Sequence, residues 1–235
     1  RVDTFVNYRQ PVKPDTLYDP IFKAIKAEKR DTLILDLRNN GGGSDDASNR
    51  LIAHLISDKA PLMSDVRVKT LNIDGLRDHL WTWDSRALNP NPLGFTKNDD
   101  GTYSMRRLAN DNLKALKPDK TAFKGKLIIL TSSANSSAST HLMSFLKGQN
   151  PDAVLIGEQT GGSAQGATAG LLFTLTLPES GIKMRIPMLQ QFINVDSFEH
   201  GYGMSPDVEV NMTAADFLSG RDPAYERALV EAGQS

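Results

Sequence analysis

Residues 127–146, LIILTSSANSSASTHLMSFL, contain the stretch that decides the fold. A short apolar run, Leu127–Leu130, is followed by small and mostly hydroxylated residues and then by an apolar stretch with helical spacing that begins at His141. This order predicts a buried strand, a tight turn and a helix. The free N–H groups and the dipole at such a helix start stabilise negative charge, so a serine in the turn could act as a nucleophile there. The alternative interpretation is an ordinary serine-rich N-cap.

The composition excludes several classes of protein. The chain has 235 residues, of which 39% are hydrophobic and 23% are charged, which fits one large globular domain or one domain with an insertion. Its formal net charge of -1 gives no indication of nucleic acid or an acidic membrane as a partner. The absence of cysteine excludes disulfides, thiolate metal sites and a cysteine nucleophile. No apolar run is long enough to predict a membrane span.

Further strand–turn–helix units surround this stretch. Thr32–Leu37 predicts a strand that ends in Gly41–Gly43, and a helix follows with Asp45 or Asp46 as its cap. Strands that alternate with helices predict an α/β fold. The polar residues 66–125 are interpreted as an insertion or lid over this core. The remaining predicted elements are a short strand at Val2–Val6, an amphipathic helix at Tyr18–Lys29, a strand at Ala153–Gly157 and a hairpin formed by Leu171–Leu177 and Ile182–Pro187.

Five segments occur in the order found in one known family. They are residues 33–43 (LILDLRNNGGG), 127–140, 156–162 (IGEQTGG), 203–210 (GMSPDVEV) and 222–229 (DPAYERAL). Together they resemble the C-terminal processing peptidases, or tail-specific proteases, and lie nearer the tricorn-like and interphotoreceptor retinoid-binding-like branch. The resemblance implies a crotonase-like superhelix of strand-strand-helix units and a single peptidase-like catalytic domain over residues 1–235. Because the chain begins at Arg1, we expect an upstream domain to be absent from it.

The resemblance also implies a catalytic site. Its nucleophile falls on Ser137, with Ser136 and Ser139 as rival positions in the same turn. Its oxyanion hole falls on Gly42 or Gly43 together with the amide of Ala138. As an alternative, the glycines only allow the chain to turn after a strand.

The general base is the part of the pattern that this sequence lacks. Most members of the family use a lysine that follows a Thr-x-Gly motif, but here that segment is Thr160–Ser163. Tricorn-like members use a histidine in the first strand of the domain, and Phe5–Tyr8 contains none. Some members of the related branch carry a histidine where this chain has Gln165. The base therefore has to be sought among the chain's own histidines.

Four histidines are available. His54 and His79 are expected on the surface. His141 lies one helical turn after Ser137, where a direct bond to an outward-pointing serine is awkward. We therefore predict His200 as the base, because it lies near the position of the family's acidic orienting residue and its ordinary pKa suits proton transfer at neutral pH. The adjacent Glu199 would orient an imidazole, as a carboxylate does in a triad.

Substrate-binding residues are less sharply indicated. Ser163, Gln165, Trp81 and Trp83 are predicted to contact substrate, although the tryptophans could equally pack the insertion. Residues 182–195 could line a groove for an extended chain or form a core strand. No metal site and no cofactor is expected, because histidines and carboxylates with the spacing of metal ligands do not occur.

The sequence therefore predicts a serine endopeptidase that cleaves extended or unfolded polypeptides through an acyl-enzyme at Ser137. The alternative is a catalytically impaired domain of the same fold that binds a peptide or a hydrophobic ligand, and a second alternative is acyl-CoA chemistry on a crotonase-like scaffold. The expected partner is a polypeptide substrate, and the expected location is extracytoplasmic, in the periplasm.

Overall fold

The computed structural model describes residues 1–233, which form two compact units. Unit 1 comprises Arg1–Ala60, Leu116–Ala164 and the chain from Val195 onward. Unit 2 comprises Pro61–Ala115 and Gln165–Asn194. The short strands β2 (Ala60–Pro61) and β7 (Ala115–Leu116) pair where the chain passes from one unit to the other.

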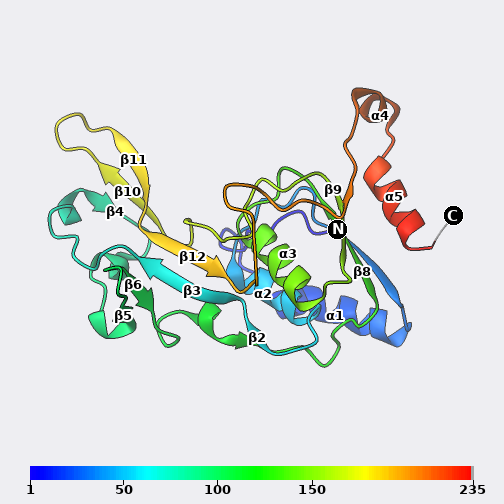
Figure 1. The fold of residues 1–235 in the computed structure, drawn as a ribbon, viewed down its shortest axis with the longest axis horizontal. Helices are drawn as coiled ribbons and strands as arrows, with labels where there is room; N and C mark the ends of the chain where they lie inside the picture. The colour runs from blue at the N-terminus through cyan, green and yellow to red at the C-terminus, as the bar shows by residue number, and fades with distance from the viewer. Residues whose placement is uncertain (234–235) are drawn as a thin grey trace. The chain divides into compact units, whose positions relative to one another are not determined.

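Unit 1 is built on a four-stranded parallel sheet (Figure 1). Its strand order is β1 (Thr32–Asp36), β8 (Lys126–Thr131), β9 (Val154–Gly157) and β13 (Val208–Glu209). From Leu127 to Thr131, β8 is buried, as expected for a central parallel strand that is covered on both faces. Because Asp36 pairs with Leu130 and Leu130 pairs with Ile156, the carboxyl ends of β1, β8 and β9 lie side by side. Loops that follow these strands therefore meet at one edge of the sheet.

Five α-helices accompany this sheet in the described residues: α1 (Pro14–Ala27), α2 (Asp45–Ala53), α3 (Ala138–Gln149), α4 (Ala214–Ser219) and α5 (Pro223–Glu231). The central helix α3 is buried from Ala138 to Leu146, so its start is held firmly in the interior. Ala228 of α5 packs with Ile128, Leu130 and Ile156 of the sheet. The residue before α5, Asp222, caps it and also receives the Arg38 guanidinium, whose Nη1 lies 2.6 Å from Asp222 Oδ1.

Unit 2 consists of two antiparallel sheets and short 3-10 turns. One sheet has the order β12 (Leu189–Ile193), β3 (Met63–Val68), β6 (Tyr103–Met105) and β5 (Phe95–Lys97). The other has the order β11 (Lys183–Pro187), β10 (Leu172–Thr176) and β4 (Leu80–Trp81). A hydrophobic cluster of Ile73, Leu80 and Phe173 anchors the second sheet. The 3-10 turns are Arg77–His79, Ser85–Leu88, Pro92–Gly94 and Asp111–Leu113.

The predicted α/β class is confirmed, and so is the hairpin, which forms β10 and β11. The cap of α2 was wrongly assigned to Asp45 or Asp46, because Ser44 occupies that position and both aspartates lie in the first turn. The first helix begins before Tyr18, at Pro14, because proline is well suited to a first helical turn that lacks N–H partners. Val2–Val6 forms only a single bridge, between Phe5 and Gly43.

The prediction that His54 lies on the surface is wrong. Its side chain is buried, its ring stacks on Phe22 with the centroids 4.4 Å apart, and its Nε2 lies 3.1 Å from Asp19 Oδ1. The imidazole can be buried because both of its nitrogens find partners, the second being the Thr121 hydroxyl at 3.3 Å from Nδ1. The prediction for His79 is confirmed, since this residue is exposed.

The insertion predicted at 66–125 overlaps the first segment of unit 2, which runs from Pro61 to Ala115. No motif or composition change predicted that Gln165–Asn194 belongs to the same unit. This second segment joins through β12, which pairs with β3 along five residues that include Leu189↔Val68 and Gln190↔Arg67. Such a long-range strand pairing leaves no local signal in the chain.

The buried His141 generates a prediction about acid stability. Burial lowers the pKa of His141 to about 4, and its Nδ1 has no hydrogen-bond partner among the described residues. An unfolded histidine titrates near 6.5, so between these values the unfolded state binds more protons. Stability is therefore lost as the pH falls from about 6.5 to about 4, by on the order of 3 kcal/mol. In urea titrations across this range, His141→Gln is expected to flatten the pH dependence.

The exposed His79 provides the matched control, because His79→Gln removes an imidazole that keeps its contact with water. The pH dependence of the unfolding free energy is expected to flatten more in His141→Gln than in His79→Gln. An equally steep acid loss in His141→Gln and in the parent protein would contradict the assignment.

Candidate active site

A buried asparagine joins the two loops that carry the predicted site. The Asn135 side chain is fully buried, and its Nδ2 donates to the carbonyl oxygens of Leu37 at 2.6 Å and Asn40 at 3.1 Å. Its Oδ1 accepts a hydrogen bond from the Ser132 N–H at 2.7 Å. The loop after β8 is thus fastened to the loop after β1, and the fastening is made inside the protein where unpaired polar groups are costly.

A third loop, after β9, meets the same point. The Gly162 N–H donates to the Asn135 carbonyl oxygen at 2.9 Å. A side chain on Gly161 would lie 2.5 Å from the Ser133 carbonyl oxygen, so the two backbones approach closely there. Glu158 closes the arrangement, because its Oε2 accepts from the Ser133 N–H at 3.1 Å and from the Ser133 hydroxyl at 2.9 Å. Loops from three parallel strands therefore fix the turn that precedes α3.

Ser137 occupies a strained position in this turn. It is the N-cap of α3 with φ 51° and ψ -130°, and among the described residues the only other non-glycine residue with positive φ is Lys29. Such a conformation costs on the order of 1–3 kcal/mol and persists only where the surroundings impose it. The Ser137 side chain is half-buried, and within the described residues its hydroxyl makes no hydrogen bond. The turn therefore presents an unengaged hydroxyl at the start of a helix.

The two rival serines are engaged in the scaffold. Ser139 is fully buried, and its Oγ accepts from Asn135 Nδ2 at 3.2 Å. The Ser136 hydroxyl donates to the Gly41 carbonyl oxygen at 2.8 Å. The geometry thus favours Ser137 over both.

The loop after β1 contains Gly41–Gly43 and is called the glycine loop; it lies directly against Ser137. A side chain on Gly42 would come within 2.9 Å of Ser137 Cβ and 3.0 Å of the Ala138 nitrogen. The Gly42 N–H is already used, because it donates to Asn40 Oδ1 at 2.9 Å. The Gly43 N–H makes no hydrogen bond within the described residues, and Ala138 opens the helix, where N–H groups have no partner inside the helix. Of the two predicted glycines, Gly43 is therefore the one whose N–H is available alongside that of Ala138.

The N-terminal segment is hydrogen-bonded to the glycine loop and fixes its position. The Phe5 N–H donates to the Gly42 carbonyl oxygen at 3.0 Å, and the Ser44 N–H donates to the Phe5 carbonyl oxygen at 2.8 Å. Phe5 is buried, and a side chain on Gly43 would collide with its backbone at 2.2 Å. Asn40 adds a further tie, because its Nδ2 donates to the Val2 carbonyl oxygen at 3.1 Å.

The structure shows no hydrogen bond between the Ser137 hydroxyl and the predicted base in the described residues. His200 is exposed and contacts the ring of Phe198, with the centroids 4.6 Å apart, and Glu199 beside it is also exposed. The His141 N–H donates to the Ser137 carbonyl oxygen at 2.9 Å, but within residues 1–233 no histidine or lysine side chain is hydrogen-bonded to the Ser137 hydroxyl. The motifs did not identify Asn40, Asn135 and Glu158 as residues that hold the site together. A lone asparagine within the hydroxyl-rich run 131–140 could have indicated a buried amide that binds backbone groups.

The predicted substrate-binding residues fall in both units. Ser163 is half-buried in unit 1, and Gln165 is half-buried in unit 2, where its carbonyl oxygen accepts from the Ile193 N–H at 3.0 Å. Trp81 and Trp83 belong to unit 2 and are exposed. In the described part of the chain, no group of three histidine or acidic side chains is placed to hold a metal ion. No helix there has the length and apolar character that crossing a membrane requires.

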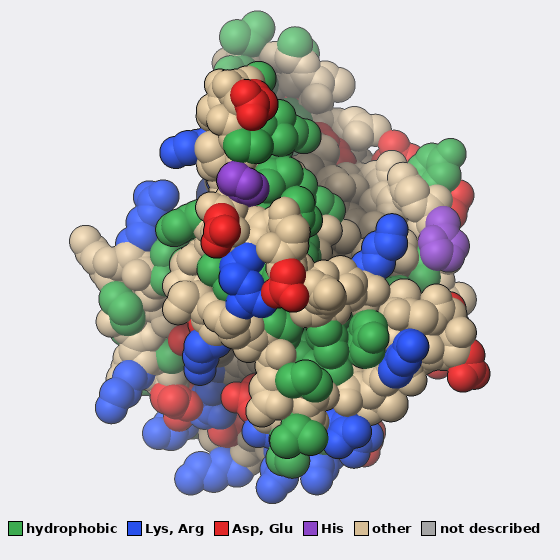
Figure 2. Space-filling model, turned by 90° about the vertical axis from the view of Figure 1, so that its left-hand side faces the viewer, with side chains coloured by type: hydrophobic (Ala, Val, Ile, Leu, Met, Phe, Trp, Pro, Cys, Tyr) green, Lys and Arg blue, Asp and Glu red, His purple; other side chains and the backbone are tan. Residues whose placement is uncertain are grey.

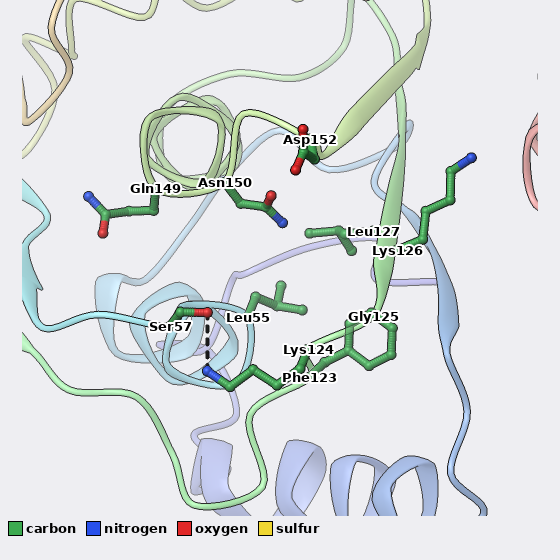
Figure 3. Close-up of a pocket in the computed structure, with 10 residues that line it drawn as sticks. All are labelled: Leu55, Ser57, Phe123, Lys124, Gly125, Lys126, Leu127, Gln149, Asn150 and Asp152. Atoms are coloured by element: carbon green, nitrogen blue, oxygen red, sulfur yellow. Dashed lines mark hydrogen bonds between the residues drawn. The ribbon is translucent and has the colours of Figure 1, made fainter.

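Two hollows lie at opposite ends of β8. One, of about 470 Å³, lies at the carboxyl end and includes Ser132, Glu158 and Arg38 in its wall. The Arg38 guanidinium there is held by Asp36 and Asp222, which raise its pKa through hydrogen bonds. The other, of about 450 Å³, lies at the amino end (Figure 3). Its wall includes Lys126 and Leu127 at the start of β8, so this second hollow lies at the other end of the strand from the serine turn, and its Lys124 is hydrogen-bonded to the Ser57 hydroxyl at 3.1 Å.

The buried amide of Asn135 generates a prediction about stability. Asn135→Ala leaves the Asn40 carbonyl oxygen and the Ser132 N–H without their partner, while the Leu37 carbonyl oxygen keeps the Asn40 N–H at 2.7 Å, and each unsatisfied buried group costs about 1–3 kcal/mol. We expect urea unfolding to show a loss of roughly 3 kcal/mol. Ser136→Ala, which removes a single half-buried hydrogen bond, should cost about 1 kcal/mol or less. Equal losses in the two variants would contradict the central role of Asn135.

Known proteins resemble this chain in sequence and in structure. The model of peptidase family S41 matches residues 2–210. Among solved structures, a protein of Parabacteroides merdae ATCC 43184 that is assigned as a peptidase is 21% identical, with a TM-score of 0.61, and the match covers 97% of this chain and 58% of that one. Mature CPAF, in complex with lactacystin, is 16% identical with a TM-score of 0.62, covering 100% of this chain and 50% of that one.

The photosystem II D1 C-terminal processing protease is 17% identical with a TM-score of 0.51, covering 90% of this chain and 41% of that one. The chain thus spans about half the length of these structures, which at such low identity show the fold alone. No curated protein matches the chain significantly. The predicted family is confirmed, while the tricorn-like branch and the crotonase-like superhelix stay predictions. Since the family model covers both the glycine loop and the serine turn, the chain belongs to peptidase family S41, a family of serine peptidases.

Proposed function

We propose that this chain is the catalytic part of a serine endopeptidase that cleaves extended or unfolded polypeptides, with Ser137 as its nucleophile. The observation that carries the proposal is the hydroxyl of Ser137. It is half-buried, makes no hydrogen bond within the described residues, and stands in a strained turn at the start of α3. Strain of this kind gathers at sites where a side chain must be presented in one orientation.

The chemistry requires each group in turn. Ser137 Oγ attacks the carbonyl carbon of the scissile amide while a base takes the hydroxyl proton. The N–H groups of Ala138 and Gly43 would donate to the resulting oxyanion. When the tetrahedral intermediate collapses, the amine leaves with a proton and an ester to Ser137 remains, which water then hydrolyses.

For the base we retain His200, oriented by Glu199, as the proposal. Its imidazole is exposed, whereas His54 is buried against Asp19 and His141 is buried in α3. Histidine is the side chain that most often acts as a general base at neutral pH.

A fluorophosphonate probe tests the nucleophile directly. The intact chain is expected to be labelled at Ser137, with the modified residue identified by peptide mass spectrometry. Ser137→Ala should abolish labelling, and Ser136→Ala should retain it, because Ser136 contributes only one scaffold hydrogen bond. If the folded chain is not labelled, or is labelled at Ser136, the proposed nucleophile is wrong.

Gly42 provides a second test. In Gly42→Ala the new methyl group would lie 2.8–3.0 Å from atoms of Ser136, Ser137 and Ala138, at a backbone φ of 96°. These clashes would push the glycine loop away from Ser137 and carry the neighbouring Gly43 N–H away from the oxyanion, so we expect the labelling rate to fall about 100- to 1,000-fold, as when an oxyanion donor is lost. Gly101→Ala is the matched control, because Gly101 also has positive φ, of 83°, but faces open space. Equal labelling rates in the two variants would contradict the role of the glycine loop.

One observation favours a second function. Within residues 1–233, no histidine or lysine nitrogen is hydrogen-bonded to the Ser137 hydroxyl. A domain with this fold and no functioning base would bind a peptide or a hydrophobic ligand without cleaving it. The fluorophosphonate experiment separates the two functions, because a serine without a base is a weak nucleophile and would stay unlabelled.

A further inference from the structure

Both tryptophans of the chain are exposed on unit 2. Trp81 is 62% exposed and Trp83 is 57% exposed, while Thr82 between them is 6% exposed. Both indoles therefore turn outward on the same side of the segment. Large aromatic side chains that face water without a partner often mark binding surfaces.

The register of the sheet β11-β10-β4 places Trp81 on a defined surface. One face of this sheet belongs to the cluster of Leu80, Phe173 and their apolar neighbours. On the other face, Trp81 lies opposite Thr174 of β10, and Thr174 lies opposite Arg185 of β11. Because side chains alternate along a strand, Lys183 shares this outer face with Arg185.

The charge on this outer face is positive. Lys183 and Arg185 are exposed, and neither forms an ion pair within the described residues. The acidic residue nearest in sequence to the tryptophans, Asp84, is already bound by Arg86 through two hydrogen bonds of 2.9 and 2.8 Å. The acidic residue of the hairpin, Glu179, lies in the turn beyond the paired residues. We call the surface of Trp81, Trp83, Lys183 and Arg185 the tryptophan face.

Figure 2 looks onto the side of the molecule where Figure 1 places β4, β10 and β11. Hydrophobic side chains gather in the upper part of this view, and lysine and arginine side chains are numerous in its lower part (Figure 2). Apolar side chains and cations are thus both exposed on this side but largely in different parts of the view, with acidic side chains among the cations. The positive charge of the tryptophan face itself comes from Lys183 and Arg185. A ligand complementary to the tryptophan face would carry both apolar groups and carboxylates along one extended chain.

We propose that the tryptophan face binds an extended acidic segment of the polypeptide substrate. Carboxylates of the segment would pair with Lys183 and Arg185, and its apolar or aromatic side chains would cover the two indoles. The proposal rests on the proposed function, since it specifies which polypeptides the peptidase receives. A nucleic acid is the less favoured occupant, because the chain as a whole carries a net charge of -1.

Binding can be measured apart from cleavage in the full chain that carries Ser137→Ala. The probe is a fluorescein-labelled, unstructured peptide of alternating glutamate and leucine or phenylalanine, followed by anisotropy. Indole emission reports contact, since both tryptophans lie on the proposed surface. We expect saturable binding, a change in indole emission, and binding at least about tenfold weaker for a peptide with lysine in place of glutamate.

Charge reversal locates the site. The double variant Lys183→Glu with Arg185→Glu is expected to weaken binding of the acidic peptide by about tenfold or more. The matched control is Lys69→Glu with Lys97→Glu, which changes the net charge equally at exposed residues beside the other sheet of unit 2 and should bind like the parent. Trp81→Ala should weaken binding with the charges intact.

Three results would overturn the proposal: equal weakening by the two double variants, tighter binding of an oligothymidylate than of the acidic peptide, or binding that disappears as the chain dissociates from a dimer on dilution. Because Ser137→Ala cannot be acylated, failure of fluorophosphonate labelling in the parent protein leaves this binding result intact. The two proposals can therefore fail separately.

Discussion

The arrangement of the site depends on one buried amide, that of Asn135. Its side chain donates to backbone carbonyl oxygens of Leu37 and Asn40 and accepts from the Ser132 N–H. Leu37 and Asn40 belong to the loop after β1, and Ser132 belongs to the loop after β8. In the protein interior these polar groups need a partner within the protein, because water is excluded. A sheet alone brings the strand ends together, but only a specific polar contact fixes the loops to one another. This contact holds the chain at Asn135, two residues before Ser137, and so constrains the turn at Ser137.

The strain at Ser137 and the glycines at 42 and 43 are two aspects of one constraint. The serine backbone is held at φ 51°, and the glycine loop approaches so closely that a methyl group on Gly42 would touch Ser137 Cβ at 2.9 Å. Phe5 limits the loop from the other side, since its backbone leaves no room for a side chain on Gly43. A tight, glycine-lined space with unpaired N–H groups is what an oxyanion hole requires. The buried packing of α3 and of the sheet offsets the free energy that this strained conformation costs.

The sequence predicted the parts of the fold that leave local patterns. The apolar run of β8, the serine turn and the hairpin of β10 and β11 were all recognisable from periodicity and turn residues. It could not predict that Gln165–Asn194 joins unit 2, because the pairing of β12 with β3 connects residues far apart in the chain. His54 was misjudged for the same reason, since its partners Asp19 and Thr121 come from distant segments. At the site, the motif indicated Ser137 and the glycines but not Asn135, whose role lies in two hydrogen bonds to the loop after β1 and one within its own loop.

The electrostatics of the histidines bear on which of them could serve as the base. Burial lowers the pKa of His141 to about 4, so its imidazole is neutral at pH 7 yet holds a proton only weakly. A general base works best when its conjugate acid has a pKa near the operating pH, and an imidazole that remains buried falls well short of this. Nearness in sequence to Ser137 therefore does not make His141 a good base, and moving it closer to the serine would not restore its basicity unless water also reached it. An effective base for Ser137 has to be an imidazole that keeps contact with water or one paired with a carboxylate. His200 is exposed, which is why His200 and not His141 stays the proposed base.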